Sequence, residues 1–493
     1  MSTADATSGP PPVDPLEAGE AGGKVIRGGG LRAAGHVAGV LIGLLSAPLV
    51  VRHLGPEDFG RYLTVTSIIF IVTGLTEGGL NNVAIRAYAT GSAQRRVLLV
   101  RDLAGLRVVL SLIGGVLALL FGLAAGYDGV LIGGLAIGSI GYVLAALQGA
   151  YAVPLQAGLK LGSVAGIDLV RSVATTALLL ALVAASASLT PFFAVVAIVH
   201  GLALALTLRL VRGTGRLRPR ADLPAWKELA QETVIYAAAT ALGAVYFQVA
   251  LVAMSVLSST LETGYYAIAF RIVDLANGIP WIFAASVLPV LAHAAEHDRV
   301  RLRYVAGRVF EGALLAGGLF SLAIVVGAEF GIDVIAGREG APAVGVLRVL
   351  GIGISATFLV ACLGFVLLSL RRYRDLMWAN GVVLLLALAL SAVLIPSAGA
   401  VGGAWTTAAL EVTLAVTYAV VLGRREPDLR VPLSALPRVA LAYGLGLAAG
   451  LALLAVHPVP ATVAAVAVYL GVLMALKAVP PELLDAVRSK LRR

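Results

Sequence analysis

"GVLIGGLAIGSIGYVLAALQGAY", residues 129–151, decides the fold class, because this long stretch contains no Asp, Glu, Lys or Arg. About 20 consecutive apolar residues are enough for a helix to cross the hydrocarbon core of a bilayer. The stretch does not alternate with polar residues, so it predicts a helix and not a barrel strand. Comparable stretches recur along nearly the whole chain, and we predict fourteen spans, at residues 34–51, 61–80, 104–126, 129–151, 161–185, 191–211, 233–256, 264–291, 306–328, 343–369, 375–396, 400–422, 436–456 and 458–478.

The composition supports the same fold class. Of the 493 residues, 59% are hydrophobic and 13% are charged, whereas soluble domains average about 45–50% apolar and about 25% charged residues. The loops between the predicted spans are too short to hold a soluble catalytic domain. The chain has no nucleotide-binding lysine motif, no paired Cys/His spacing and no Ser/His/Asp arrangement. We therefore expect an all-α polytopic membrane protein that is not an enzyme and holds no cofactor or metal.

Lysine and arginine residues gather on one side of the predicted spans. Cytoplasmic loops retain these residues, and the connections on the other side hold only Arg52, Arg61, Arg338 and Arg348. Both termini are therefore predicted to be cytoplasmic, in a protein of the cytoplasmic membrane. The net charge of +10 reflects this asymmetry and an attraction to anionic membrane lipids. The basic residues are spread over separate loops without interleaved aromatic residues, so we expect no nucleic-acid partner.

A short motif occurs twice on the predicted outer face. Both "LGPEDFGRYLTV", residues 54–65, and "LSSTLETGYYAIAF", residues 257–270, contain an acidic residue, a glycine and a tyrosine at the same spacing. The repeat predicts two parallel six-helix lobes, unless the pattern recurs by chance. We therefore expect a disordered cytoplasmic tail at 1–30, an N-lobe at 31–212, a basic cytoplasmic linker at 213–230, a C-lobe at 231–422, and two further spans with a basic cytoplasmic tail at 423–493.

Five charged residues lie deep inside predicted spans, away from the span ends. Asp168 and Arg171 are three residues apart, as are Arg271 and Asp274, and Glu411 stands alone in the twelfth span. Residues at i and i+3 share a helix face, so each pair can form an ion pair. A charge at the centre of a bilayer costs about 2.5–3.5 kcal/mol on insertion scales, so these residues need partners or water. The pairs are either structural, holding helices in register, or part of a binding site.

Several stretches together resemble one family. They are "LGPEDFGRY", "EGGLNNVAIRAYA", "ETGYYAIAFRIVDLANGIPWIFAASVLPVLAHA", "GREGAPAVGVLRVLGIG" and "LIPSAGAVGGAWTTAALEV", which begin at residues 54, 77, 262, 337 and 394. In combination they resemble the O-antigen and capsule flippases, the polysaccharide-export branch of the multidrug/oligosaccharidyl-lipid/polysaccharide exporter superfamily. The resemblance implies twelve core helices in two lobes and alternating access. It implies a polyprenyl-pyrophosphate-linked glycan as cargo, with polysaccharide polymerases and glycosyltransferases as partners.

The resemblance also implies where such a cargo binds. The basic position within "YYAIAFRI" faces the central cavity in the family, so Arg271, with Asp274, is the expected contact for the pyrophosphate, which guanidinium groups bind in a bidentate manner. The polar stretch "TEGGLNNVAIRAYA", residues 76–89, becomes the inner mouth of the cavity. Its candidate contacts are Glu77, Asn81, Asn82 and Arg86, although a helix end with an interfacial arginine is the alternative. Asp168, Arg171 and Gln248 are further candidates for the cavity.

Other polar residues within the spans are candidates for a coupling ion, Na+ or H+. We single out Glu411, Asn380 and Thr406 for this role, although most such residues simply form hydrogen bonds between helices. Two alternative functions stay open. One is a cation-coupled antiporter for drugs or small molecules in the same superfamily. The other is a membrane glycosyltransferase or polymerase, for which Glu57 and Asp58 are the acidic residues, but the chain lacks a large outer domain.

Overall fold

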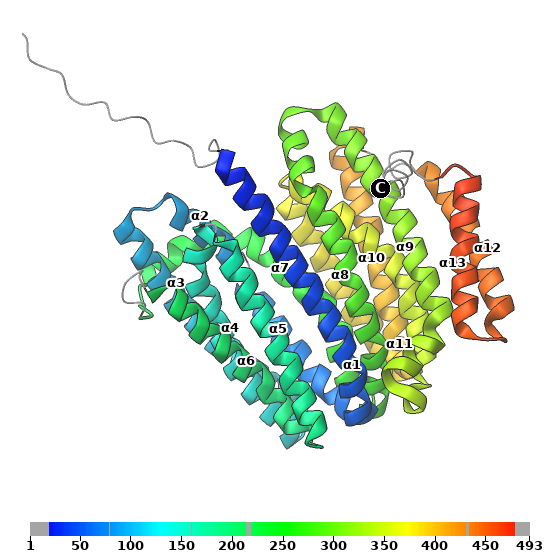
Figure 1. Ribbon diagram of the computed structural model, residues 1–493, viewed down its shortest axis with the longest axis horizontal. Coiled ribbons are helices and arrows are strands. Elements are labelled where there is room, and N and C mark those ends of the chain that lie inside the picture. Colours follow the sequence, from blue (N-terminus) through cyan, green and yellow to red (C-terminus); the bar gives the residue numbers. More distant parts are fainter. Residues whose placement is uncertain (1–18, 78, 159, 213–217, 430–432, 479–493) are drawn as a thin grey trace, which may run out of the picture.

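The computed structural model describes residues 19–77, 79–158, 160–212, 218–429 and 433–478, and these residues form helices without a β-strand (Figure 1). Each predicted span falls on a helix, which confirms the all-α fold class. The helices are α1 (Gly19–Glu77), α2 (Leu80–Thr90), α3 (Ala93–Ala124), α4 (Gly129–Ala157), α5 (Leu161–Ala184), α6 (Leu189–Leu210), α7 (Leu223–Leu257), α8 (Thr260–His297), α9 (Arg299–Ala336), α10 (Ala343–Ser369), α11 (Tyr373–Arg425), α12 (Leu436–Leu454) and α13 (Pro458–Ala475).

Eleven of the described helices are long and apolar enough to cross a membrane. The number is smaller than fourteen partly because α11 runs through two predicted spans, with a kink at Gly399 where φ is 53°. In the same way α1 runs through the first two predicted spans, with a kink at Gly55 where φ is 70°. A positive φ is accessible to glycine at little cost, so each glycine changes the direction of the helix without an intervening loop.

Three predicted boundaries differ from the ends of the helices. The predicted tail at 1–30 overlaps α1, which already begins at Gly19, while residues 1–18 lie outside the described part. The second span was expected to reach residue 80, but it ends at Glu77, and α2 follows as a separate helix. The linker was expected to reach residue 230, but α7 begins at Leu223 because Asp222 accepts a hydrogen bond from the backbone N–H of Ala225 and caps the helix.

The first and second halves of the chain lie side by side, with α1 between them (Figure 1). Helix α1 packs against α5 of the first half and against α7 and α8 of the second half. Helices α12 and α13 pack against each other and against α9, at the edge far from α3–α6. The exact arrangement of the halves as two parallel six-helix lobes stays a prediction.

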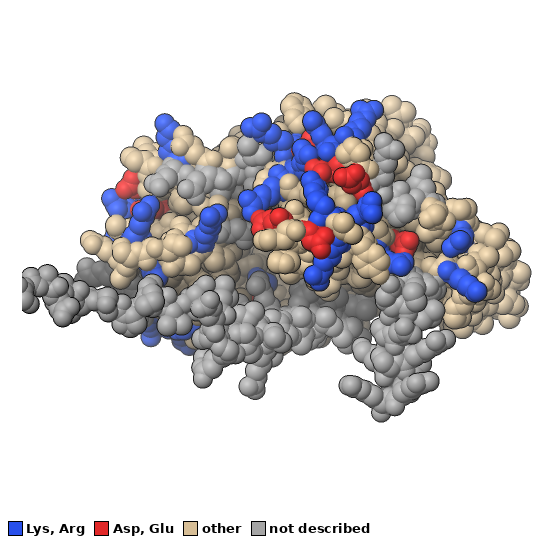
Figure 2. All heavy atoms as spheres, turned by 90° about the horizontal axis from the view of Figure 1, so that it is seen from above, with Lys and Arg blue, Asp and Glu red and all other residues tan. Residues whose placement is uncertain are grey.

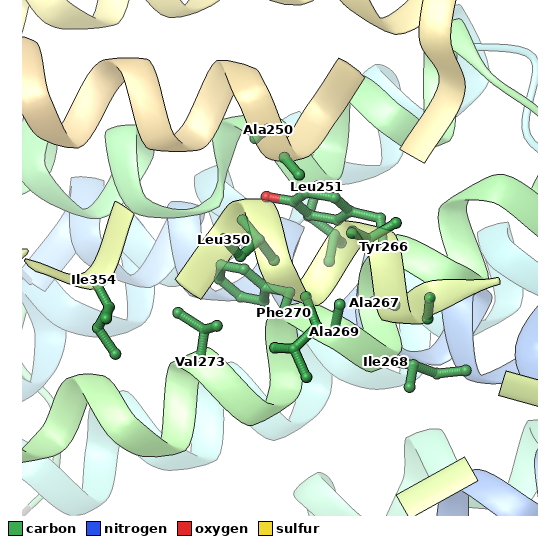
Figure 3. Close-up of a cluster of buried hydrophobic side chains, with 14 of the residues drawn as sticks. Ala250, Leu251, Tyr266, Ala267, Ile268, Ala269, Phe270, Val273, Leu350 and Ile354 are labelled. Carbon is green, nitrogen blue, oxygen red and sulfur yellow. The ribbon is translucent and has the colours of Figure 1, made fainter. Parts of the chain in front are cut away.

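The largest buried cluster joins α1 to the second half. Figure 3 shows part of this cluster, with Leu251 of α7, Tyr266 and Phe270 of α8 and Leu350 of α10 in contact. Tyr266 and Phe270 are stacked with ring centroids 5.8 Å apart. Offset aromatic pairs of this kind stabilise a core by about 0.5–1.5 kcal/mol beyond their burial. This packing fixes α8 against α7 and α10, the helices that carry the site.

The two copies of the repeated motif meet in space. A Cβ atom on Gly60 would lie 2.8 Å from the backbone nitrogen of Gly264, and a Cβ on Gly264 would lie 2.1 Å from the carbonyl oxygen of Pro56. Arg52 Nη2 also donates to the carbonyl oxygens of Asp333 and Val334, both at 2.8 Å. The kinked middle of α1 is therefore held against α8 and α9 at the predicted outer face, and only glycine permits the close approach to α8.

Candidate functional site

A cavity of about 620 Å³ lies among α1, α7, α8, α10 and α11. Ligand pockets typically measure about 300–1,000 Å³ and combine apolar walls with a few polar groups. The cavity extends to Leu368 and Tyr373, at the end predicted to be cytoplasmic. Its polar and amphipathic lining residues are Tyr246, Asp274, Asn277, Trp281, Thr357, Tyr373, Asn380, Glu411 and Tyr418.

The Arg271–Asp274 ion pair lies at the edge of this cavity. Arg271 Nη1 donates to Asp274 Oδ2 at 3.2 Å, which confirms the pairing predicted from the i, i+3 spacing. Both side chains are about one-third exposed, at 33% and 34%. Asp274 lines the cavity, whereas Arg271 is not among its lining residues. The pair neutralises the guanidinium, and about one-third of the Arg271 side chain stays exposed.

Glu411 occupies a narrow pocket that continues from the cavity. The narrow pocket has space of about 20 Å³, enough for one water-sized occupant, and is lined by Tyr246, Asn277, Thr357 and Glu411, among others. Glu411 is 6% exposed, and its Oε2 atom has no hydrogen-bond partner among the described residues. A buried carboxylate oxygen without a partner is costly, and the side chains of Tyr246 and Thr357 lie beside this carboxyl group.

The other two candidates for ion coupling lie differently. Asn380 lines the large cavity and accepts a hydrogen bond from Tyr418 Oη at 3.1 Å. Thr406 is fully buried, and its hydroxyl donates to the carbonyl oxygen of Gly402 within α11. The next residue, Thr407, lines the narrow pocket instead. The structure therefore brings Glu411 and Asn380 to one cavity but does not bring Thr406 to it.

Gln248 and the Asp168–Arg171 pair lie away from the lining of the cavity. Gln248 Oε1 accepts a hydrogen bond from Ser67 Oγ at 2.8 Å, in a buried contact between α7 and α1. Arg171 Nη2 lies 3.0 Å from Asp168 Oδ1, so this predicted pair also forms. It sits on α5, and no residue of that helix is among the cavity's lining residues. Its placement suits a self-neutralised pair on a helix surface.

The predicted inner mouth is built around the break between α1 and α2. Glu77 is the last residue of α1, and Gly79 before α2 has a φ of 75°. Asn81 Nδ2 donates to Gln156 Oε1 at 3.0 Å, which ties α2 to α4. Arg86 is exposed. The side chain of Asn82 lies outside the described part of the chain.

Sequence reasoning missed Arg107 as a partner of this region. Arg107 is only 3% exposed, and its Nη1 lies 4.0 Å from Glu77 Oε1 and donates to the carbonyl oxygen of Ala146 at 3.3 Å. A Cβ atom on Gly149 would lie 2.2 Å from this nitrogen. In the sequence, Arg107 looks like one more basic residue near a cytoplasmic helix end. Nothing in the sequence around Gly149 indicates that this glycine makes room for the side chain of Arg107.

Charged residues gather on the face where α1 begins and α11 ends, which is seen from above in Figure 2. Glu426 there accepts a hydrogen bond from Arg372 Nη2 at 2.6 Å and lies 3.0 Å from Arg299 Nη2. Burial raises the pKa of Glu426, but the two guanidinium groups outweigh burial and hold this pKa below its ordinary value. The carboxylate thus links the α10–α11 loop, the start of α9 and the end of α11.

We expect this link to contribute stability that depends on pH. Because the pKa of Glu426 is lowered in the folded state, its contribution is present above the unfolded pKa of about 4.3 and is lost as the pH falls through the folded pKa. Glu426→Gln is expected to cost about 1 kcal/mol at pH 7. Thermal unfolding in detergent at pH 7 and pH 3.5 measures this. An equal difference between wild type and variant at both pH values contradicts the prediction.

The apolar helices and the cavity define a class of protein, a polytopic helical membrane protein with an internal cavity between its helices. A family model described as "Polysaccharide biosynthesis protein" matches residues 25–295, which is more than half of the chain. The chain therefore belongs to this family. A search of curated proteins finds no match.

Solved structures show the same fold at low sequence identity. The "Lipid II flippase MurJ, inward closed conformation" is 13% identical with a TM-score of 0.75, over 90% of this chain and 97% of that one. An inward-facing multidrug resistance MATE family transporter of the MOP superfamily is 14% identical with a TM-score of 0.62, over 79% and 95%. A MOP superfamily transporter from Pyrococcus furiosus is 16% identical with a TM-score of 0.54, over 82% and 96%. The chain thus has the fold of the MOP superfamily.

Proposed function

We propose that this protein is a flippase that moves a polyprenyl-pyrophosphate-linked oligosaccharide from the inner to the outer leaflet of the cytoplasmic membrane. The observation that carries the proposal is the Arg271–Asp274 pair at the edge of a large cavity. The family description, polysaccharide biosynthesis, and the likeness to a lipid II flippase support it. The wider polysaccharide machinery, polymerases and glycosyltransferases, supplies the expected partners.

The ion pair suits reversible binding of a pyrophosphate. Asp274 holds the guanidinium of Arg271 when no cargo is bound, so that the charge is never left without a partner in apolar surroundings. An arriving pyrophosphate replaces the carboxylate and forms charge-assisted hydrogen bonds with the planar guanidinium. Binding therefore exchanges one anion for another, and the cargo leaves when the exchange reverses.

The shape of the molecule supports alternating access from the inner side. The contact between Gly60 and Gly264 closes the predicted outer face, while the cavity reaches Leu368 and Tyr373 at the predicted inner end. Transport in this scheme requires the glycine contact to open and the inner end to close. The scheme keeps both termini in the cytoplasm, position 57 on the outer face and position 220 on the cytoplasmic face. Cysteines introduced at positions 57 and 220 test this topology by their reaction with an impermeant thiol reagent.

The direct test is transport by the purified full chain in proteoliposomes. We expect a fluorescent polyprenyl-pyrophosphate-linked oligosaccharide, added to one leaflet, to reach the other leaflet faster than in protein-free vesicles. Protein-free vesicles are the control, because the polar glycan hardly crosses a bilayer unaided. Equal rates with and without protein contradict the proposal.

We propose further that Glu411 binds the coupling ion, a proton or Na+, in its narrow pocket. The support is its buried Oε2 atom without a partner among the described residues. Glu411→Gln keeps the size of the side chain but removes its charge. We expect this variant to lose the response of transport to an imposed Na+ or proton gradient, with the protein still folded. A variant that responds to both gradients as wild type does excludes Glu411 from coupling.

An antiporter for drugs or other small molecules is the second candidate function. It is supported by the likeness to multidrug transporters and by the many apolar residues of the cavity, among them Phe70, Phe247, Phe365 and Leu414. The two functions differ in cargo, so the proteoliposome assay separates them. Gradient-driven movement of a hydrophobic organic cation without movement of the lipid-linked oligosaccharide favours the antiporter.

A further inference from the structure

Two glycines leave open space in the wall of the large cavity. Gly243 of α7 and Gly278 of α8 both line it. A Cβ atom built at either position meets no atom within 4 Å, and neither residue has a positive φ. Glycine inside a helix is less favourable than alanine because it loses more conformational entropy on folding. Neither packing nor backbone conformation requires glycine at these two positions, and the open space in the cavity wall leaves room for a ligand to lie against the bare backbone.

One face of α8 connects the ion pair to this open space. Residues at i, i+3, i+7 and i+10 follow one helix face, and these positions are Arg271, Asp274, Gly278 and Trp281. At 1.5 Å per residue, Trp281 lies about 15 Å from Arg271 along the helix. A molecule whose phosphate binds Arg271 therefore places its next groups against Gly278 and Trp281.

The side chains along this face have the chemistry that a sugar requires. Trp281 is 50% exposed, lines the cavity, and meets Phe365 edge to face with ring centroids 5.6 Å apart. Aromatic rings stack on the apolar C–H face of a pyranose while hydrogen-bonding groups bind its hydroxyls. Asn277 lines the cavity and is 6% exposed, and its Oδ1 atom is buried without a hydrogen-bond partner among the described residues. A sugar hydroxyl supplies the partner that this oxygen lacks.

We propose that the α8 face from Asp274 to Trp281, with Gly243 of α7 in the same cavity wall, is a carbohydrate subsite. It binds the sugars next to the pyrophosphate, and the proposal rests on the proposed flippase function. The bare backbone at Gly278 leaves room for the sugar ring, the Trp281 ring stacks on the sugar, and Asn277 forms a hydrogen bond with one of its hydroxyls. A site built to bind a hydroxyl discriminates strongly against ligands that lack it. This face therefore selects the glycan, while Arg271 binds the pyrophosphate of any such lipid.

Two probes and three variants test the subsite. The probes are lipid-linked oligosaccharides extracted from the source cells and synthetic polyprenyl pyrophosphate without a glycan, each bound to the full chain in nanodiscs. The variants are Gly278→Leu, which fills the open space, Trp281→Leu, which removes the stacking surface, and Gly345→Leu. Gly345 is the matched control, because a Cβ there also meets no atom within 4 Å but Gly345 does not line the cavity.

We expect wild type to bind the glycan-bearing lipid about tenfold more tightly than polyprenyl pyrophosphate. Gly278→Leu and Trp281→Leu are each expected to reduce this ratio to about one, with affinity for polyprenyl pyrophosphate within about twofold of wild type. Gly345→Leu is expected to leave both affinities unchanged. If both cavity variants keep the wild-type ratio of affinities for the two probes, the subsite proposal is wrong. It is also wrong if wild type binds the two probes equally. If wild type binds neither probe, the proposed function itself fails.

Discussion

Arg271→Ala is expected to reduce transport of the lipid-linked oligosaccharide severely while the protein still inserts into the membrane. The substitution removes the guanidinium at the edge of the cavity, 3.2 Å from Asp274. Hydrogen bonds to charged groups contribute about 1.5–3 kcal/mol, so the loss of one anion contact lowers transport by about tenfold to a hundredfold or more. Arg271→Lys keeps the charge but loses the planar fork, so its rate is expected to be intermediate.

The Asp168–Arg171 pair provides the matched control for this experiment. It has the same i, i+3 spacing and a similar nitrogen–oxygen distance of 3.0 Å, with side chains of comparable exposure at 35% and 40%. Arg171→Ala therefore perturbs membrane insertion about as much as Arg271→Ala does. Transport in proteoliposomes is measured for both, normalised to the amount of reconstituted protein.

The comparison separates a binding role from a structural one. If Arg271→Ala moves the cargo at the wild-type rate, its ion pair only holds helices, and the anion contact lies elsewhere. If Arg271→Ala and Arg171→Ala lose transport equally, both pairs serve the same purpose. The double variant Arg271→Ala, Asp274→Asn checks that the loss does not arise from the carboxylate left without its partner.

The sequence was sufficient to predict which segments form long apolar helices, because the composition of such a segment favours a helix in lipid. It was also sufficient for the two ion pairs, since partners at i and i+3 on one helix meet whatever the tertiary structure is. The kinks at Gly55 and Gly399 blurred the count of spans. Both sit in loops expected between spans, but there a positive φ at one glycine replaces a loop.

The cavity could not be predicted in the same way. Periodicity shows which residues share a helix face, but in a membrane every face of a helix can be apolar, so the pattern does not show which face meets which neighbour. Tyr418 illustrates this, because its bond to Asn380 joins two segments of α11 on either side of the Gly399 kink. Arg107 shows a second limit of the sequence. A basic residue near a helix end is expected at the membrane surface, but the side chain of Arg107 is buried.

Gly264→Leu is expected to shift the protein from the closed state to one that is open at the outer face. A Cβ on Gly264 would lie 2.1 Å from the carbonyl oxygen of Pro56, a backbone atom that cannot rotate away. Overpacking of this kind costs about 1–3 kcal/mol, and the cost falls only on the state in which α1 and α8 touch. The ratio of open to closed molecules is therefore expected to rise by about tenfold or more.

Spin labels at positions 57 and 338, both exposed on the predicted outer face, report the opening as a longer inter-label distance. Gly345→Leu serves as the control, because the added side chain meets nothing within 4 Å and is expected to leave the distance unchanged. A protein held open at the outer face cannot return to load cargo at the inner leaflet, so transport by Gly264→Leu is expected to fall while binding from the outer side persists. An unchanged distance distribution together with normal transport shows that the glycine contact is not the outer closure, and that the clamp from Arg52 to the end of α9 closes this face instead.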